Sequence, residues 1–159
     1  MPPSVTNVAV LGSTGSIGRS AMEVIEASGG RLRAVALVAR TSTALLERQA
    51  VSAQPRWIVV TDPAAAAAHD FSGVGPDVEV LVGPEAVSRV VAGEQVDVVL
   101  SAVVGRAGLE GTWAALEAGK TVALANKESL VMAGPLVTQL ARQNRARILP
   151  VDSEHSAVF

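Results

Sequence analysis

Short apolar runs alternate with longer amphipathic stretches along the whole chain. The apolar runs predict strands over residues 8–11, 32–39, 57–60, 78–82, 97–101, 121–124 and 148–151. The amphipathic stretches predict helices over residues 21–27, 43–50, 64–69, 85–91, 109–118 and 130–144. Gly134-Pro135 predicts a break or a fresh start in the last helix. This alternation predicts an α/β domain with a doubly wound, mostly parallel, Rossmann-like sheet that is covered by helices on both faces.

The first strand runs directly into three glycines spaced G-x-x-G-x-x-G, which are Gly12, Gly15 and Gly18. An amphipathic helix follows and is closed by Gly29 and Gly30. This order places free backbone N–H groups and the positive end of a helix dipole at one point, which suits an anion. We expect Gly12 to allow the turn, Gly15 to let a pyrophosphate approach, and Gly18 to let the helix pack closely on the strand. A purely structural turn is the alternative.

The end of the second strand indicates which dinucleotide is bound. NAD-specific sites place an Asp or Glu there to bind the ribose 2′-hydroxyl. This chain has Arg40, Thr41 and Ser42 instead. Because a guanidinium and hydroxyls suit a 2′-phosphate, the sequence favours NADPH over NADH. The alternative is a surface Arg40 followed by Ser42 or Thr43 as a helix cap, and both interpretations can hold together.

Composition narrows the functional classes. The length of 159 residues suits one domain, and the formal net charge of −2 gives no electrostatic reason to expect nucleic acid or an anionic membrane. The chain has no cysteine, which excludes disulfides, thiolate metal sites and cysteine nucleophiles. No apolar run reaches the length of a membrane span, and no basic segment precedes an apolar one at the N-terminus. We therefore expect a soluble, cytoplasmic protein.

Polar clusters follow two of the later strands, where ligands of such sheets bind. The clusters are Asn126-Lys127-Glu128 after the strand at 121–124, and Asp152-Ser153-Glu154-His155 after the strand at 148–151. Asp152 and Glu154 can both turn toward one hard cation, and oxygen ligands suit Mg²⁺ or Mn²⁺. Each cluster has a plainer alternative: an acidic helix start for the carboxylates, an exposed salt bridge for Lys127-Glu128, and a packing or supporting role for His155.

Three segments in this order resemble one family: Gly12-Ser-Thr-Gly-Ser-Ile-Gly18, Leu124-Ala-Asn-Lys-Glu-Ser-Leu-Val131 and Pro150-Val-Asp-Ser-Glu-His155. Together with Val103-Val104-Gly105 and Gly119-Lys120-Thr121, they are similar to 1-deoxy-D-xylulose 5-phosphate reductoisomerases over essentially the whole chain. The resemblance implies an NADPH-dependent oxidoreductase and isomerase of non-mevalonate isoprene biosynthesis, which makes 2-C-methyl-D-erythritol 4-phosphate. It also implies a divalent cation, magnesium or manganese, and a homodimer.

The resemblance also implies roles for individual residues. Thr14, Gly15, Ser16 and Ile17 would hold the NADPH phosphates, and Asn126 and Glu128 would contact the cofactor further along. Asp152 and Glu154 would be metal ligands, Lys127, Ser153 and Glu154 would contact the substrate, and Lys127 and Glu154 would be catalytic. The cation would stabilise oxyanion charge, and Lys127 would stabilise or shuttle charge at a substrate hydroxyl. Family members usually show Gly, then Lys or Ser, then Asn where this chain has Arg40-Thr41-Ser42, so the expected 2′-phosphate contacts do not come from the resemblance.

The same resemblance predicts a division of the chain. Residues 1–150 would form an NADPH-binding domain, and residues 151–159 would begin a metal- and substrate-binding catalytic domain. Family sequences continue far past the position of Phe159. We therefore expect this chain to lack a third carboxylate ligand, a flap over the substrate and a C-terminal helical domain, and to bind NADPH without turning over the substrate.

Two other functions stay open. The first is a free-standing, non-catalytic module that senses or carries a dinucleotide. Retention of Lys127 and of Asp152-Ser153-Glu154 favours the enzyme domain, because a sensor needs no metal and sugar-phosphate site. The second is another NADPH-linked reductase, such as a semialdehyde dehydrogenase, and the lack of a cysteine nucleophile argues against it.

Overall fold

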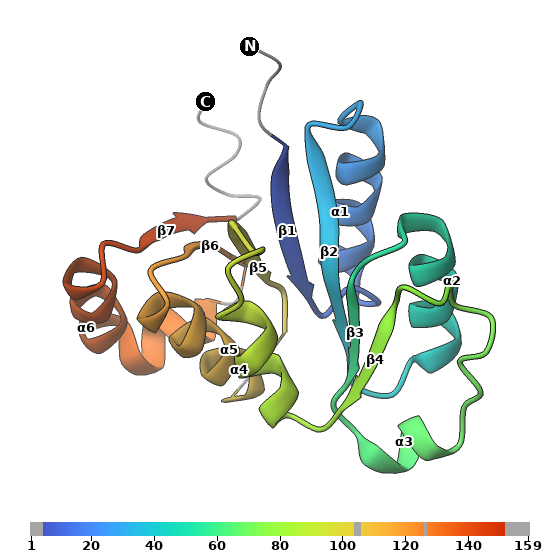
Figure 1. Ribbon diagram of the computed structural model, residues 1–159. Helices are drawn as coiled ribbons and strands as arrows, with labels where there is room; N and C mark the ends of the chain where they lie inside the picture. The colour runs from blue at the N-terminus through green and yellow to red at the C-terminus, as the bar shows by residue number, and fades with distance from the viewer. Residues whose placement is uncertain (1–4, 104–105, 126, 152–159) are drawn as a thin grey trace.

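The computed structural model describes residues 5–103, 106–125 and 127–151, with the backbone alone for residues 106–107 and 127–133 (Figure 1). The strands are β1 (Thr6–Leu11), β2 (Leu32–Ala39), β3 (Trp57–Val60), β4 (Glu79–Val82), β5 (Val98–Ser101), β6 (Thr121–Leu124) and β7 (Arg147–Pro150). The helices are α1 (Ser16–Ala27), α2 (Thr43–Ala53), α3 (Pro63–Ala67), α4 (Glu85–Val91), α5 (Arg106–Glu117) and α6 (Lys127–Gln143). Every predicted strand is therefore confirmed, with shifts of one or two residues at the ends of most of them.

The strands form one seven-stranded sheet in the order β4-β3-β2-β1-β5-β6-β7, and every neighbouring pair is parallel. From β1 the chain moves outward to β4, then returns to the other side of β1 with β5 (Figure 1). Parallel neighbours need crossover connections, and the intervening helices supply them. The predicted doubly wound, Rossmann-like fold is confirmed, and the point where the strand order reverses lies between β1 and β5.

Two apolar clusters cover the two faces of the sheet. Alternate residues of β1 belong to different clusters: Ala9 and Leu11 to one, Val8 and Val10 to the other. This division follows from the two-residue period of a strand, and it explains why the central strands are apolar throughout. Leu116 and other buried residues of α4, α5 and α6 close the first cluster, whereas buried residues of α2 and partly buried ones of α1 close the second.

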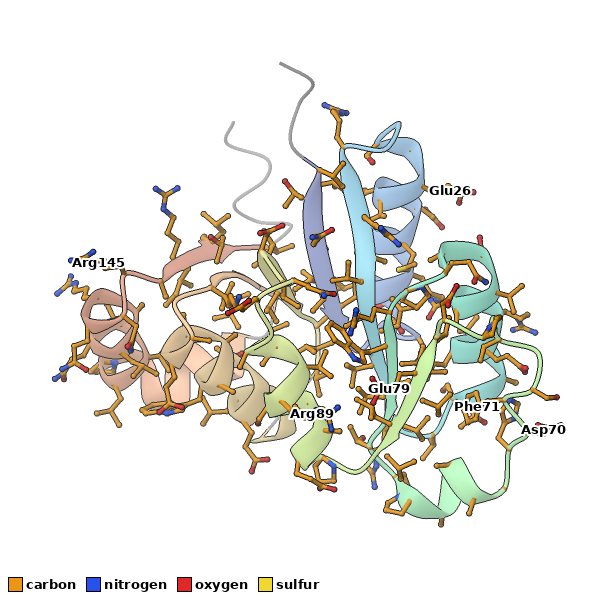
Figure 2. All side chains as sticks on the ribbon, viewed as in Figure 1. Glu26, Asp70, Phe71, Glu79, Arg89 and Arg145 are labelled. Atoms are coloured by element: carbon orange, nitrogen blue, oxygen red, sulfur yellow. The ribbon has the colours of Figure 1, made fainter. Side chains whose placement is uncertain are left out.

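The β4 edge of the sheet is held by an exposed polar network. Glu79 of β4 accepts a hydrogen bond from the indole N–H of Trp57 at 3.0 Å and pairs with Arg89 of α4 at 3.3 Å. Figure 2 shows Glu79 and Arg89 facing each other across the gap between β4 and α4. Both members of the ion pair are about half exposed or more, so the pair orders this edge without contributing much stability.

The last helix corrects one expectation, because α6 runs from Lys127 to Gln143 without a break at Pro135. Proline removes one backbone donor and usually clashes with the Cβ of the residue before it. Here the preceding residue is Gly134, which has no Cβ, so the helical conformation is tolerated. The buried side chains of Val137 and Ala141 then anchor the second half of the helix on the sheet.

Helix boundaries differ from the expectations at other points. The first helix begins at Ser16 and the fifth at Arg106, each earlier than predicted, and α3 ends at Ala67 rather than at His69. Ser42 is the N-cap of α2, as one of the two interpretations predicted, but its side chain makes no capping hydrogen bond. Within the described ranges, no helix is both long enough and apolar enough to cross a bilayer.

Candidate functional site

The glycine turn between β1 and α1 is tightly held by backbone contacts. Gly12 has φ +80°, and a Cβ there would lie 2.9 Å from the carbonyl oxygen of Ala102, the residue after the neighbouring strand β5. The N–H groups of Gly12 and Ser13 both donate to the carbonyl of Val38, at 2.9 and 3.0 Å. The predicted role of Gly12 is therefore confirmed, since only glycine fits both the conformation and the space.

Gly18 has a different contact from the one predicted. A Cβ on Gly18 would lie 2.6 Å from the Cα of Ser13 and closer still to the carbonyl oxygen of Gly12. The third glycine thus allows the first turn of α1 to lie directly on the glycine turn itself, rather than on the body of the strand. The sequence spacing identified the need for a close approach, but the surface approached is decided by how the turn folds back.

The start of α1 leaves backbone donors free. Gly15 is the N-cap, in extended conformation with φ −73° and ψ 174°, and no side chain caps the helix. The first three N–H groups of a helix have no partner within it. Here they belong to Ser16, Ile17 and Gly18, and the described residues provide no acceptor for them. The first turn also carries no acidic side chain, so an anion can approach these donors and the positive end of the helix dipole.

A groove of about 450 Å³ opens beside this turn, at the carboxyl ends of the central strands. Its lining includes Leu11, Gly12, Thr14, Gly15, Val38, Ala39, Arg40, Thr61, Ala102 and Val103, which come from the ends of β1, β2, β3 and β5 and from the segments after them. Helices α4 and α5 and the residue before α4 complete the lining, with Pro84, Val87, Ser88, Glu110 and Gly111. Ligands of doubly wound sheets bind in such a crevice, where the strand order reverses.

Several of these lining residues were not singled out from the sequence. Thr61 follows β3, and Pro84 and Ser88 lie at the start of the helix after β4. The signal that could have found them is their position, because each comes shortly after an apolar run that ends at the same edge of a parallel sheet. Nothing in the residues themselves distinguishes them from other loop positions.

Arg40, for which we expect contact with the 2′-phosphate, lines the groove at the end of β2. Its side chain is exposed and makes no ion pair with any described residue. The neighbouring strand end carries Asp62, but the carboxylate of Asp62 accepts from the N–H of Ala65 and caps α3. A positive charge is therefore available at the end of β2, where the ribose of a dinucleotide would lie. Thr41 and Ser42 are exposed beside it.

A buried hydroxyl pair supports the floor of the groove. The hydroxyl of Thr112 on α5 donates to the hydroxyl oxygen of Ser101 at 2.9 Å, and both residues are fully buried. Ser101 is the last residue of β5, immediately before Ala102 and Val103, which line the groove. The pair therefore fixes α5 to the end of β5, directly before the two residues that line the groove.

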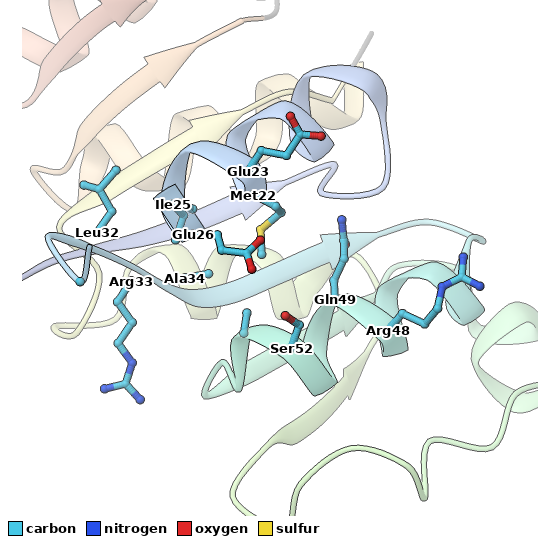
Figure 3. Close-up of a pocket in the computed structure, with 12 residues that line it drawn as sticks. Met22, Glu23, Ile25, Glu26, Leu32, Arg33, Ala34, Arg48, Gln49 and Ser52 are labelled. Atoms are coloured by element: carbon cyan, nitrogen blue, oxygen red, sulfur yellow. The ribbon is translucent and has the colours of Figure 1, made fainter. Parts of the chain in front are cut away.

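A second groove, of about 460 Å³, lies between α1 and α2 over β2 (Figure 3). Met22 and Ile25 of α1 face Gln49 and Ser52 of α2 across it, and acidic and basic side chains stand at its rim. It contains neither the free N–H groups of α1 nor a strand carboxyl end. We therefore place the candidate site in the groove beside the glycine turn.

The predicted metal and substrate residues are only partly placed. Asn126, Asp152, Ser153, Glu154 and His155 lie outside the described residues. Lys127 and Glu128 form the start of α6, described by its backbone only, at the same sheet edge as the glycine turn. Among the described residues, no group of three or more His, Cys, Asp or Glu side chains is arranged to hold a metal ion.

Comparison with known proteins gives a consistent result. The family model of 1-deoxy-D-xylulose 5-phosphate reductoisomerase matches residues 8–134. The reductoisomerase of Dechloromonas aromatica is 47% identical over all of this chain and 40% of its own length. A reductoisomerase from Zymomonas mobilis in complex with NADPH aligns with a TM-score of 0.86 and 39% identity, over 96% of this chain and 40% of that one. A DOX-P reductoisomerase in complex with NADPH, fosmidomycin and magnesium aligns with a TM-score of 0.87 and 40% identity, over 97% of this chain and 38% of that one. The chain thus spans about 40% of the length of these relatives.

Proposed function

The chain belongs to the 1-deoxy-D-xylulose 5-phosphate reductoisomerase family, and from that membership we propose that it is the NADPH-binding part of such an enzyme. The reaction is conversion of 1-deoxy-D-xylulose 5-phosphate to 2-C-methyl-D-erythritol 4-phosphate. The observation that carries the proposal is the groove at the switch point, which is lined both by Gly15, the N-cap before the free N–H groups of α1, and by Arg40 at the end of β2. The relative from Zymomonas mobilis, in complex with NADPH, has the same fold over this region.

The geometry of the groove supports NADPH in particular. The free N–H groups of Ser16 and Ile17 and the exposed backbone of Gly15 suit the pyrophosphate. Arg40, with Thr41 and Ser42 beside it, suits the 2′-phosphate, because a guanidinium forms charge-assisted hydrogen bonds with phosphate oxygens. Thr14 and Val103 line the part of the groove nearest the reversal of strand order.

We assign the rest of the reaction to the polar segments after β6 and β7. Residues 1–150 form the cofactor domain, and residues 151–159 begin the catalytic domain. Asp152 and Glu154 offer the oxygen ligands that Mg²⁺ or Mn²⁺ prefers, and Leu149 and Val151 before them are about half exposed, as suits the junction of two domains. Asn126 and Glu128 contact the cofactor, and Lys127 and Ser153 bind the substrate.

The chemistry then divides between groups bound by the protein and its own side chains. When bound, the cation supplies positive charge at substrate oxygens and NADPH supplies a hydride. Lys127 holds or moves a proton at a substrate hydroxyl, and the glycine turn and Arg40 orient the cofactor. We place the whole enzyme in the cytoplasm, as a homodimer.

The decisive experiment joins this chain to a catalytic partner. In a chimera, it replaces the corresponding 40% of the Dechloromonas aromatica relative, and NADPH oxidation is followed with substrate and Mg²⁺ or Mn²⁺. We expect turnover that is lost in the Asp152→Ala and Glu154→Ala chimeras. We expect the 159-residue chain alone to bind NADPH without turnover. A folded chimera that binds NADPH but has no activity would favour the alternative, a non-catalytic dinucleotide-binding module.

A further inference from the structure

Among the described residues, one side chain is hydrogen-bonded to the backbone of the glycine turn, and it comes from α2. The amide nitrogen Nε2 of Gln49 donates to the carbonyl oxygen of Ser13 at 2.8 Å, across 36 residues of sequence. Ser13 lies in the middle of the turn and is fully buried. Figure 3 shows Gln49 on α2, across the groove from α1.

This hydrogen bond completes the set of contacts that fix the turn. On one side, the N–H groups of Gly12 and Ser13 are held by the carbonyl of Val38 on β2. Within the turn, the N–H of Gly15 donates to the carbonyl of Gly12 at 3.1 Å. Among the described residues, Gln49 alone donates to the carbonyl of Ser13, and without it a buried acceptor would be left unpaired.

The amide orientation is dictated by this contact. The other amide atom, Gln49 Oε1, is buried without a hydrogen-bond partner in the described structure, as is the hydroxyl of Ser13. Turning the amide over would place Oε1 against the carbonyl oxygen of Ser13, and two acceptors repel each other. The site therefore needs a donor at the end of this side chain, and an apolar side chain of the same length would not replace it.

Helix α2 also links the segment of Arg40 to the glycine turn. It begins at Thr43, directly after Arg40, Thr41 and Ser42. Gln49 lies seven residues after the N-cap Ser42, which corresponds to about 10 Å along a helix at 1.5 Å per residue. The same helix thus begins just after the residues proposed to bind the 2′-phosphate and, through Gln49, holds the turn proposed to bind the pyrophosphate.

We propose that Gln49 is a positioning residue, which holds the glycine turn in the conformation that binds the pyrophosphate of the cofactor. The inference rests on the proposed binding of NADPH. Gln49 does not touch the cofactor groove itself, so its effect is exerted through the backbone of Ser13 and the N–H groups that follow it.

The first test compares two ligands in the Gln49→Met variant of the full chain. NADP⁺ carries the pyrophosphate, whereas adenosine 2′-monophosphate carries only the adenosine and the 2′-phosphate. Calorimetric titration should show the Kd for NADP⁺ raised by about five- to tenfold, the range of one lost hydrogen bond, with the Kd for adenosine 2′-monophosphate unchanged. Gln139→Met, at an exposed glutamine of α6 outside the groove, should leave both Kd values as in the unmodified chain.

The second test restores the donor with protons. In Gln49→Glu, an ionised carboxylate would face the carbonyl of Ser13, and burial beside that carbonyl raises the pKa of an introduced carboxyl. Protonation gives the side chain an O–H donor. The ratio of its Kd for NADP⁺ to that of the unmodified chain should therefore fall as the pH is lowered from about 8 to about 5.5. Gln49→Met has no titrating group, and its ratio should stay constant.

The outcomes separate this inference from the proposed function. If the unmodified chain binds neither ligand, the proposed NADPH site is wrong. If the unmodified chain binds both, the positioning role is overturned by equal losses for both ligands in Gln49→Met, by no loss at all, or by a pH-independent ratio in Gln49→Glu. Selective loss for NADP⁺ with recovery at low pH would support it.

Discussion

Gly15 and Gly18 stand three residues apart in the same turn, and their substitution is expected to have opposite consequences. Gly15 has φ −73° and ψ 174°, a conformation that a β-branched residue adopts without strain. A Cβ there meets only the carbonyl oxygen of Gly12, at 3.4 Å. Gly18 has no such room, because its Cβ would lie 2.6 Å from the Cα of Ser13. We therefore predict that Gly15→Val removes cofactor binding and keeps the fold, whereas Gly18→Ala damages the fold.

The magnitudes follow from these contacts. A valine at position 15 costs the folded state less than about 1 kcal/mol, so the Tm should stay within about 4 °C of the unmodified chain. Its branches occupy the approach to the free N–H groups of Ser16 and Ile17. Loss of two charge-assisted hydrogen bonds at about 1.5 kcal/mol each weakens NADPH binding by about a hundredfold or more. Gly18→Ala forces backbone against backbone, at a cost of at least about 3 kcal/mol and about 6–12 °C in Tm.

Two measurements separate the effects. Thermal unfolding followed by circular dichroism reports the fold, and titration of NADPH fluorescence reports binding. The reasoning would be refuted if Gly15→Val bound NADPH like the unmodified chain, because Gly15 would then be a structural turn residue only. It would equally fail if Gly15→Val unfolded, or if Gly18→Ala were as stable as the unmodified chain.

Three further predictions concern other parts of the molecule. Arg40→Glu should weaken NADPH binding by about 1.5–3 kcal/mol with little effect on NADH, as measured by titration of both cofactors, and equal affinities of the unmodified chain for the two would contradict the role of Arg40. Thr112→Val keeps the shape of the side chain but removes its hydrogen bond to Ser101, so chemical denaturation should show a free energy of unfolding lower by about 1–2 kcal/mol. An unchanged midpoint would show that the buried pair does not contribute to stability. Hydrogen bonds from the N–H and the hydroxyl of Ser72 lower the pKa of the exposed carboxyl of Asp70. The stability that these bonds contribute is therefore present above the ordinary carboxyl pKa of 3.8 and is lost as the pH falls through the lowered value. An NMR titration of Asp70 that gave an ordinary or raised pKa would contradict this.

Local sequence patterns were sufficient to predict the helices and strands, and to predict the glycine turn and the position of Arg40 in the candidate site. Parallel strands buried on both faces must be apolar at consecutive positions, so each of them stands out as a run such as Val35–Ala39. The glycine turn could be predicted because Gly12 and Gly18 meet a requirement that arises within a few residues. Arg40 could be predicted for the same reason, since it directly follows the strand whose end it occupies.

The sequence by itself thus determined the class of fold, the glycine turn that we propose binds the cofactor phosphates, and the charge at the end of β2. Only the tertiary structure decided that β5 lies beside β1, which groups Thr61, Ser88 and Val103 into one groove. It also decided that Gln49 meets Ser13, and that α6 continues through Pro135 because Gly134 and buried packing permit it. The physical reason is the same in each case. Each of these residue types is common in its own local segment, so the local sequence gives no sign of the contact. The contacts form because elements that are tens of residues apart in the chain pack against one another.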